Sequence, residues 1–511
     1  MALANFIDKI NLSAAQRIKA YDRNIFEQKL MSHIIGIEFA ENALETKEGR
    51  CALDLTIRII SRLYPAINVI DASKNKSGET FKMKLIEIAK QINPQIECNE
   101  KPATIKIYIG DVEESPEDIT CIYIGSDNWL SYYSRLNPLK CNDRNNPFGP
   151  AGAVCIACAN LFRFIFNDEL NKPRLDDELC FSVFNHQINN AVKQGPILKK
   201  IPVSFTLIGA GAIGNAVIWA FSQLNDVMGD MHIIDKETVA ISNLQRYILM
   251  FKDHVNGSKV EIAKAMLSLH ENLTITICPD QWQNVIGSLK QENLKLIATA
   301  IDTRKERLLI QSTLPRKIVN AWTSTDDIGI SRHLDFLNGA CLGCLYMPNQ
   351  KEKSESEKIA ESLGMGAHEP FLRSYIANRQ PIDEQFAAIV HQYSGIDQNL
   401  IREYIGQQVI IFYSEAICGG RIFKVNGANG NDQNMEVPLA HESVFAGILL
   451  AAEIVIESIG GRAENFPLLT KINLLRPAHN NFLEEEQKHY SGLCICQDDE
   501  FVGRYKEKWN T

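Results

Sequence analysis

The chain has 511 residues, of which 45% are hydrophobic and 23% charged, a composition typical of folded proteins and not of disordered or fibrous ones. At roughly 100–200 residues per domain, this length predicts about three domains. The net charge of −9 argues against broad electrostatic binding to nucleic acid or to an anionic membrane.

The sequence predicts a cytoplasmic protein with no export signal and no membrane span. Its N-terminus lacks the basic-then-apolar order of a signal peptide. The apolar stretch at 444–456 is interrupted by Gly447 and Glu453, which makes it too short and too polar to cross a bilayer. The 13 cysteines therefore indicate metal binding or thiol chemistry and not a framework of disulfide bonds.

The first 198 residues alternate short strands with helices, as α/β folds do. A β-branched run predicts a strand at residues 105–110, and apolar residues at helical spacing predict a helix at 79–92. The sequence NNPFGPAG at 145–152 predicts a turn before an apolar helix at 153–166.

Residues 203–221, VSFTLIGAGAIGNAVIWAF, predict a buried strand, a glycine turn and a helix. Gly209, Gly211 and Gly214 fit the pattern G-x-G-x-x-G, which permits a tight turn, close approach of backbone to phosphate, and close helix packing. The helix that follows offers its N–H groups to an anion. The next strand ends at Asp235, about 20 residues after the last glycine, where an acidic side chain meets ribose hydroxyls. Taken alone, the pattern predicts a nucleotide site and favours NAD.

The residues that follow favour a triphosphate. Asn243 and Arg246 lie in DKETVAISNLQRY, directly after the ribose carboxylate, and Lys259 follows in GSKVEIAKA. A triphosphate under attack needs cations that neutralise the charge developing on its oxygens. Farther on, Asp302 ends a predicted buried strand, on the ligand side of a parallel sheet, where a carboxylate can hold Mg²⁺. Arg307 follows it, and we interpret these residues as one ordered set.

Over residues 203–310 the sequence resembles the E1-like adenylating enzymes, the superfamily of sulfur-carrier activators and ubiquitin-activating enzymes. The resemblance is carried by GAGAIG, by D-x-E-x-V-x-x-SNLQR, by the downstream lysine and by the D-x-x-x-x-R step. Glu237 stands for the family's second acidic residue, and Thr303 replaces the usual Asn.

The resemblance implies ATP and Mg²⁺ as cofactors and assigns a role to each polar residue of the set. It implies Asp235 for the ribose, Asn243, Arg246 and Lys259 for the phosphates, and Asp302 for Mg²⁺ and the α-phosphate. It also implies an α/β fold of two Rossmann-like adenylation folds with mostly parallel sheets, because the superfamily works as paired folds in which one lends an arginine to the other's ATP.

The first half resembles a degenerate partner of this kind. Tyr21-Asp22-Arg23-Asn24 resembles the family's Y-[SD]-R-Q segment, and residues 147–167 resemble its closing helix, yet no G-x-G-x-x-G or SNLxR occurs between residues 25 and 145. We expect Arg23 to act as an arginine finger, since a guanidinium is always charged and binds phosphate oxygens bidentately. The alternative is that Arg23 is a surface charge on a helix.

Two short-spaced cysteine pairs predict a structural zinc site. Cys341 and Cys344 form a C-x-x-C knuckle, and Cys494 and Cys496 form a second pair near the C-terminus. Four thiolates suit tetrahedral Zn²⁺ and leave no open position for catalysis. The alternative is two unrelated thiol pairs. Another C-x-x-C pair, Cys155 and Cys158, lies on the apolar helix, and we interpret it as core thiols.

Cys418, in SEAICGGRIF, is the candidate nucleophile. The flanking glycines permit close approach of a second chain, and a thiol forms an acyl bond that remains reactive for transfer. In the E1 resemblance a cysteine on a crossover segment captures the activated C-terminus as a thioester, and residues 437–455 resemble the helix that follows such a segment. The alternative is a small buried cysteine in a glycine turn.

These observations predict four parts of the chain. They are an inactive adenylation-like domain at 1–198, the active adenylation domain at 199–348, a helical insertion and crossover segment with the catalytic cysteine at 349–425, and the end of the active domain with a zinc-binding tail at 426–511.

The resemblance implies ATP-dependent activation of the C-terminus of a ubiquitin-like protein, its capture on Cys418 and its transfer to an E2-like protein. The architecture resembles bacterial E1-like proteins of antiphage ubiquitin-like conjugation systems. Two alternatives remain: a sulfur-carrier or peptide-modifying adenylyltransferase without a thioester, and a nucleotide-binding scaffold without chemistry.

Overall fold

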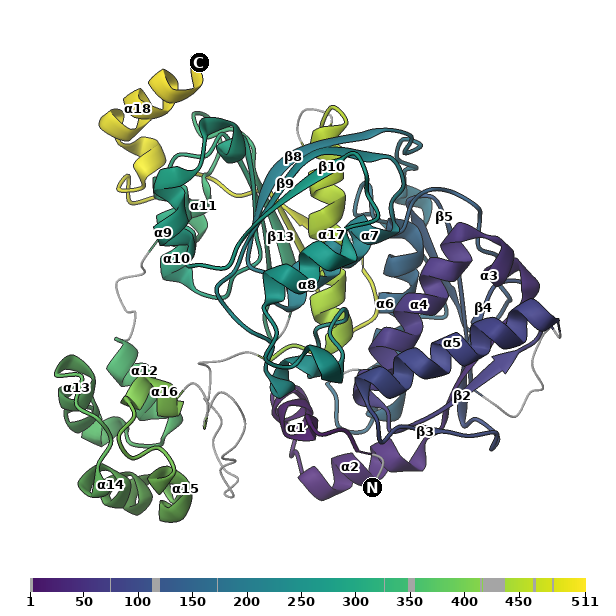
Figure 1. The fold of residues 1–511 in the computed structure, drawn as a ribbon, viewed down its shortest axis with the longest axis horizontal. Helices are drawn as coiled ribbons and strands as arrows, with labels where there is room; N and C mark the ends of the chain where they lie inside the picture. Colours follow the sequence, from purple (N-terminus) through teal and green to yellow (C-terminus); the bar gives the residue numbers. More distant parts are fainter. Residues whose placement is uncertain are drawn as a thin grey trace. The chain divides into compact units, whose positions relative to one another are not determined.

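The computed structural model describes residues 3–73, 75–112, 120–171, 173–325, 327–347, 354–413, 416, 437–462, 466–479 and 482–511. They form two compact units (Figure 1). The first unit comprises Met1–Phe6, Asp22–Met347 and Pro438–Thr511, and the second comprises Ile7–Tyr21 and Pro348–Val437. The chain therefore leaves the first unit and returns to it twice.

The first unit contains two sheets, and we call the parts of the chain that build them the first half and the second half. The first sheet has the order β3 (Glu97–Cys98), β2 (Ala66–Asp71), β1 (Ile35–Phe39), β4 (Ile105–Ile109), β5 (Thr120–Asp127), β6 (Leu130–Ser134) and β7 (Glu178–Ser182). The second has the order β10 (Leu273–Cys278), β9 (Val227–Ile234), β8 (Ile201–Ile208), β11 (Leu296–Thr299), β12 (Lys317–Thr323), β13 (Ile328–His333), β14 (Leu469–Ile472) and β15 (Leu483–Glu484).

The two sheets share one topology. In each, five parallel strands come first, in the order third, second, first, fourth and fifth along the chain, and antiparallel strands extend the sheet beyond the fifth. This strand order places the loops after the first and fourth strands side by side, at the point where the order reverses and where such folds bind nucleotides. The prediction of an α/β protein with two Rossmann-like folds is confirmed.

Long helices fill the space between the sheets. In the first half α6 (Phe148–Ile165) packs on α4 (Lys47–Leu63) and on strands β5 and β6, and in the second half α17 (Ala440–Ser458) packs on α7 (Ala212–Gln223) and on β12 (Figure 1). Helices α6 and α17 also contact each other. Helix α6 is long and apolar enough to cross a membrane, but nearly all of it is buried inside the protein, as expected of a core helix.

The turn predicted at 145–152 is wrong over its second part, because α6 already begins at Phe148. Pro150 lies in the first turn, where a helix needs no N–H donor. A Cβ on Gly149 would lie 2.4 Å from the carbonyl oxygen of Asn128, and one on Gly152 would lie 2.3 Å from the Ser131 hydroxyl. These glycines therefore serve close packing of helix on sheet and not a turn. The helix predicted at 79–92 forms as α5 (Lys76–Ile92).

The halves differ most in the connection that follows their second strand. In the second half, residues 235–258 separate β9 from α8 (Lys259–Met266) and include the 3-10 helices η2 (Ile241–Gln245) and η3 (Lys252–His254). In the first half only residues 72–75 separate β2 from α5. The first half therefore lacks the whole segment that carries SNLQR in the second.

Shorter elements complete the first unit: α2 (Arg23–Ser32), α3 (Glu41–Glu45), η1 (Asn189–Ala191), α9 (Trp282–Val285), η4 (Ile286–Ser288), η5 (Gln291–Leu294), α10 (Arg304–Ser312), α11 (Leu342–Leu345), η8 (Ile495–Gln497) and α18 (Asp499–Trp509). The regular elements of the second unit, within its described residues, are helices: α1 (Ile7–Ala15), α12 (Glu355–Ser362), η6 (Gly366–His368), α13 (Glu369–Ala377), α14 (Glu384–Ser394), α15 (Gln398–Arg402) and α16 (Val409–Phe412). Helices α12 to α16 enclose an apolar core with Phe386 and Phe412 at its centre.

Candidate functional site

The glycine turn joins β8 to α7, and its three glycines have different reasons to be glycine. Gly209 has φ +96°, and a Cβ there would lie 2.4 Å from the carbonyl oxygen of Ala300. A Cβ on Gly214 would lie 2.2 Å from the carbonyl oxygen of Gly209. A Cβ on Gly211 would instead meet nothing closer than the Tyr247 hydroxyl at 3.4 Å. Gly209 and Gly214 therefore serve the protein's own packing, and Gly211 leaves room for a ligand against the backbone.

Asp235 lies directly after β9 and holds the glycine turn. Its carboxylate accepts hydrogen bonds from the N–H of Ala210 at 2.7 Å and from the N–H of Glu237 at 2.8 Å. Burial raises the pKa of this carboxyl above its ordinary value, and the charge of Lys259 acts against that shift. The structure thus brings the expected ribose ligand to the expected loop.

Lys259 is the first residue of α8, and its side chain is only 1% exposed. Its ammonium group contacts the Glu237 carboxylate and lies 3.2 Å from the Tyr247 hydroxyl. Burial alone would lower the pKa of Lys259, but Tyr247, Asp235 and Glu237 raise it above the ordinary value. The lysine therefore carries a fixed positive charge beside Asp235.

Asn243 and Arg246 come from the turn formed by η2. The Asn243 side-chain oxygen accepts a hydrogen bond from the N–H of Ala240 at 2.9 Å, which caps this turn. The half-buried Arg246 guanidinium donates to the Gln245 side chain at 3.1 Å and lies 5.7 Å from the centre of the Tyr247 ring. Lys259 lies 4.9 Å from the same ring centre. Two cations therefore flank one aromatic ring next to the glycine turn.

Asp302 follows β11, the strand that pairs with β8, and its side chain is exposed. No residue in the described part of the chain binds its carboxylate, so its oxygens remain available to a cation. Arg307, expected to belong to the functional set, is buried and donates to Asn320 at 3.0 Å and to the carbonyl of Ile301. Arg307 therefore supports the loop that carries Asp302.

Two residues of this site had no assigned role in the sequence. Tyr247 directly follows SNLQR, and this position next to the motif is the sequence feature that could have identified it as a site residue. Asn215 directly follows Gly214 and is fully buried; its amide donates to the carbonyl of Ala210 at 2.9 Å and accepts from the N–H of Leu249 at 3.3 Å. Asn215 thus joins the glycine turn to the segment that carries Arg246, a role that depends on contacts the local sequence does not reveal.

Arg23 is the first residue of α2, which Asp22 caps by accepting a hydrogen bond from the N–H of Ile25 at 2.9 Å. Its guanidinium forms an ion pair with Glu27 at 2.8 Å, and the Arg23 side chain is 44% exposed. The arrangement keeps the cation at the surface, one helical turn from a carboxylate. Cys418 lies outside the residues that the structure describes.

The four cysteines predicted to bind zinc meet at one buried point. Cys341 and Cys344 come from the start of α11, and Cys494 and Cys496 from η8. Their sulfur atoms all lie within 4.8 Å of one another, and four of the separations are between 3.4 and 3.9 Å. Tetrahedral Zn²⁺ with sulfur at about 2.3 Å requires separations of about 3.8 Å. The cluster fits a structural metal such as zinc, which would hold the C-terminal tail on the second half.

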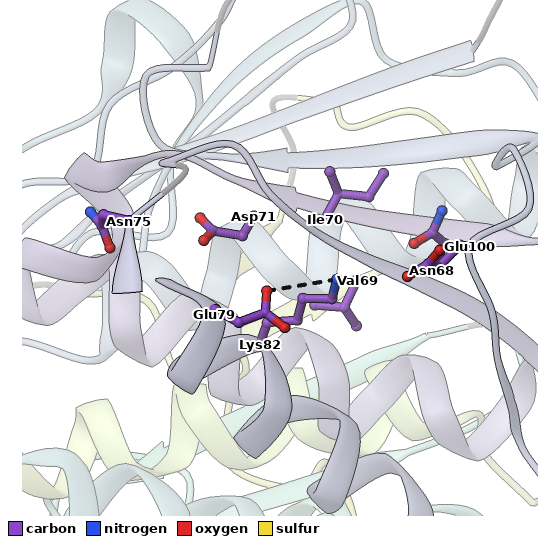
Figure 2. A pocket seen from close by; sticks show the side chains of 8 residues that line it. All are labelled: Asn68, Val69, Ile70, Asp71, Asn75, Glu79, Lys82 and Glu100. Atoms are coloured by element: carbon purple, nitrogen blue, oxygen red, sulfur yellow. Dashed lines mark ion pairs between the residues drawn. The ribbon is translucent and has the colours of Figure 1, made fainter. Parts of the chain in front are cut away.

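The first half has a polar hollow of about 390 Å³ between β2 and α5, lined by Asn68, Val69, Ile70, Asp71, Asn75, Glu79, Lys82 and Glu100 (Figure 2). Figure 2 shows the 4.0 Å ion pair between Glu79 and Lys82. Asp71 ends β2 but accepts from the N–H of Ser73 at 2.9 Å, and a Cβ on Gly78 would lie 2.1 Å from its carboxylate. This carboxylate therefore packs on the start of α5 and does not repeat the link from Asp235 to the glycine turn.

Residues 185–488 match the ThiF family, and residues 38–167 match the family described as prokaryotic E2 family C. The match to the ThiF family contains the glycine turn, Asp235, Arg246, Lys259, Asp302 and the first cysteine pair of the metal cluster. The match to prokaryotic E2 family C contains β2, β4, β5 and all of α6.

Similar proteins span different parts of the chain. The protein y4jF of Sinorhizobium fredii strain NGR234, described as uncharacterized, is 33% identical over 518 residues, which cover 100% of this chain and 98% of that protein. The adenylyltransferase and sulfurtransferase UBA4 of Debaryomyces hansenii is 28% identical over 217 residues, 40% of this chain and 48% of that protein. UBA4 of Scheffersomyces stipitis is 25% identical over 183 residues, 34% of this chain and 41% of that protein.

Among solved structures, MccB of E. coli has a TM-score of 0.32 at 12% identity, covering 56% of this chain and 68% of that chain. Because the ThiF match spans more than half of the residues and contains the ATP motifs with the geometry described above, the assignment rests on sequence and site together. The chain belongs to the ThiF family of E1-like adenylating enzymes.

Proposed function

We propose that this protein activates the C-terminal carboxylate of a ubiquitin-like protein with ATP, holds the product as a thioester on Cys418 and passes it to a separate E2-like protein. The observation that carries the proposal is the convergence of Gly211, Asp235, Arg246 and Lys259 around one open position of the glycine turn. NAD would not require two cations there, whereas a triphosphate would.

In the proposed first step, a carboxylate oxygen of the ubiquitin-like protein attacks the α-phosphorus of ATP. The bond from the α-phosphorus to the bridging oxygen breaks, pyrophosphate leaves, and an acyl-adenylate forms. Asp235 holds the ribose, while Asn243, Arg246 and Lys259 offset the negative charge that grows on the phosphate oxygens. Arg23 of the first half adds a further cation, released from its ion pair with Glu27.

Asp302 fits the role of the Mg²⁺ ligand, because its exposed carboxylate follows the strand next to β8 and is not bound by a neighbour in the described chain. Bound Mg²⁺ would offset charge on the phosphate oxygens. Asp302 itself supplies the negative charge that holds a cation at this edge of the sheet.

In the proposed second step, the thiolate of Cys418 attacks the acyl carbon and AMP leaves, so that one carbon–sulfur bond replaces one carbon–oxygen bond. The thiol gives up its proton before this attack, because the thiolate is the nucleophile. The thioester keeps enough reactivity for transfer to a thiol of the E2-like protein.

The match of residues 38–167 to prokaryotic E2 family C raises a second candidate, in which the first half accepts the acyl group itself. An acceptor cysteine needs an accessible thiolate. Burial raises the pKa of both Cys51 and Cys141 to about 12, and it also raises the pKa of Cys155 and Cys158. We therefore propose that these four thiols are structural and that the E2-like acceptor is another protein; the half-buried Cys98 and Cys121 are the remaining thiols of this range, and loss of transfer in Cys98→Ala or Cys121→Ala would contradict this.

The adenylation step is tested with the full chain by measuring isotope exchange between pyrophosphate and ATP. The reaction contains a ubiquitin-like protein encoded beside the gene of this chain. Exchange that depends on this protein supports the proposal, and its absence would leave a nucleotide-binding scaffold. The matched control is the same ubiquitin-like protein with an amidated C-terminus, which has no carboxylate to attack ATP and is expected to give no exchange.

The thioester step is tested by non-reducing electrophoresis after incubation with ATP. The unaltered chain is expected to form an adduct that thiols cleave, and Cys418→Ala is expected to lose that adduct while retaining pyrophosphate exchange. Cys278→Ala, at the end of β10, is the matched control and is expected to retain both. An adduct that persists in Cys418→Ala would favour the alternative of an adenylyltransferase without this thioester.

Conjugation in antiphage defence and a cytoplasmic location are the wider context that we propose. Genes for a ubiquitin-like protein, an E2-like protein and a deubiquitinase-like protein beside this gene would support that context, and their absence would favour sulfur-carrier or peptide modification.

A further inference from the structure

Helix α4 belongs to the first half, yet it carries a stripe of charged residues that faces the second half. Asp54, Arg58 and Arg62 follow one another at intervals of one helical turn, so they share one side of the helix. Arg58 is 7% exposed and Arg62 is 1% exposed. Two buried guanidinium groups in one helix are costly unless their N–H groups are bound, which makes their partners informative.

The partners are backbone carbonyls of the segment that carries the cationic residues of the ATP site. Arg62 donates to the carbonyls of Leu244 and Met250, the second at 3.0 Å, and Arg58 donates to the carbonyl of Ile248 at 3.0 Å. These three carbonyls lie on both sides of Arg246. The guanidinium of Arg58 also lies 5.3 Å from the centre of the Phe251 ring.

Asp54 completes the link to the glycine turn. Its carboxylate accepts hydrogen bonds from Arg58 at 2.8 Å and from the indole N–H of Trp219 at 2.8 Å. Trp219 lies on α7, the helix that begins at the glycine turn. A single helix of the first half therefore contacts both the segment around Arg246 and the helix that follows the glycine turn.

A packing role alone would not need charge at these positions. The hydrogen-bond partners of Arg62 within the described residues are carbonyls and not a carboxylate, and its burial in an apolar environment disfavours the charged form. An apolar side chain of similar length would fill the same space without this cost, but it could not fix the carbonyls. The guanidinium groups of Arg58 and Arg62 therefore provide what an apolar side chain cannot: N–H donors that bind carbonyls on both sides of Arg246.

We propose that Arg58 and Arg62 are positioning residues, through which the first half fixes the segment 244–250 in the shape that lets Arg246 bind the triphosphate. The proposal rests on the proposed function, because it concerns the same ATP site. It assigns the first half a part in ATP binding that does not involve Arg23.

The test measures Mg-ATP binding to the full chain by isothermal titration calorimetry, together with the thermal unfolding midpoint. Arg62→Met is expected to weaken ATP binding on the order of 10-fold, since small displacements of binding groups cost factors of 10 to 100. Arg62→Lys keeps a cation and one or more donors, and it is expected to recover part of the loss. Arg58→Met retains Arg62 and is expected to weaken binding less, which provides a variant if Arg62→Met does not fold.

The matched control is Arg163→Met. Arg163 is 2% exposed, but it donates to the carbonyl of Arg174 at 2.8 Å and to Asp176 at 2.5 Å, both in the first half. We expect it to lower the unfolding midpoint and to leave ATP affinity unchanged.

Three outcomes are distinct. Weak binding by the Arg62 and Arg58 variants, with normal binding by Arg163→Met, supports the proposal. Normal ATP affinity in folded Arg62→Met or Arg58→Met, or an equal loss in the control, would overturn it. Failure of the unaltered chain to bind Mg-ATP would overturn the proposed function itself.

Discussion

The ammonium group of Lys259 lies 3.2 Å from the hydroxyl of Tyr247, and this hydroxyl is also the closest atom to the open side of Gly211. One side chain therefore connects the buried cation to the place where a phosphate can approach the backbone. Lys259 has Glu237 as a second partner, but that carboxylate is largely exposed, so Tyr247 is the partner that water competes with least.

Tyr247→Phe is expected to weaken Mg-ATP binding roughly 10-fold, because a hydrogen bond to a charged group contributes about 1.5–3 kcal/mol. Calorimetric titration of the full chain measures the change. The matched control is Tyr505→Phe, which removes another partly buried hydroxyl, one that donates to the carbonyl of Arg316 at 2.9 Å. Unchanged affinity in Tyr247→Phe would contradict a role for this hydroxyl in the site.

Arg23→Ala is expected to lower the rate of adenylation on the order of 10³-fold while changing ATP affinity little, because an arginine finger acts on charge that develops in the transition state. Single-turnover kinetics and ATP titration separate the two quantities. Glu27→Gln breaks the ion pair with Arg23 but keeps the guanidinium, so it is expected to behave like the unaltered chain. An Arg23→Ala enzyme with a normal adenylation rate would show that Arg23 is a surface charge.

Cys494→Ser is expected to abolish stoichiometric zinc and to lower the thermal unfolding midpoint, because metal binding to the folded state stabilises it. Elemental analysis of the purified chain measures the metal. Cys155→Ala removes a buried thiol from the C-x-x-C pair on α6 and is expected to retain the metal. Equal metal content in both variants would argue against ligation by the four-cysteine cluster.

Glu48 on α4 predicts a pH-dependent loss of stability. Its carboxylate is fully buried and accepts hydrogen bonds from Ser126 at 2.5 Å and from the N–H of Asn128 at 2.8 Å. Burial raises its pKa to about 7, despite these two hydrogen bonds. A raised folded pKa means that the stabilising contribution is present below the unfolded pKa, near 4.3, and is lost as the pH rises through about 7.

Glu48→Gln keeps the shape but does not ionise; its amide oxygen can accept from the N–H of Asn128, and its NH2 can donate to the Ser126 hydroxyl. It is expected to exceed the unaltered chain in unfolding free energy by about 3 kcal/mol at pH 8 and to match it only near pH 4, where the unfolded carboxyl is also protonated. Urea unfolding at the two pH values measures the difference. Glu45→Gln, an exposed change at the end of the preceding helix α3, is the control and is expected to show no such dependence. A gap that is the same at both pH values would contradict the assignment to Glu48.

Much of the fold could be predicted because its parallel strands are continuous apolar runs and its nucleotide loop has a local motif. The antiparallel strands that extend the second sheet, β13 to β15, could not be predicted. Ile328 of β13 pairs with Ile472 of β14, and the Pro348–Val437 part of the second unit lies between them in sequence. The start of α6 was missed because Gly149 and Gly152, which permit close packing, have the composition of a turn.

The residues of the site also fall into those that could be predicted from the sequence and those that could not. The position of Asp235 could be predicted because the helix and strand between it and the glycine turn fix the spacing. Lys259 follows a long connection, and only its place in the motif series indicated it. Arg307 looked like part of the charged set, but its contact with Asn320 comes from a neighbouring strand and makes it a support for the loop. The role of Arg62 depends on the packing of one half on the other, which no local pattern contains.

The short connection at 72–75 also sets how many nucleotides the two related halves can hold. An ancestor with two equal halves would have had two equivalent sites, and single substitutions could have silenced or restored either one. Here the first half is missing the entire stretch that corresponds to 235–258, so no point mutation regenerates a second site. The expected stoichiometry is therefore one Mg-ATP per chain, and the loss of symmetry between the halves is, in evolutionary terms, hard to reverse.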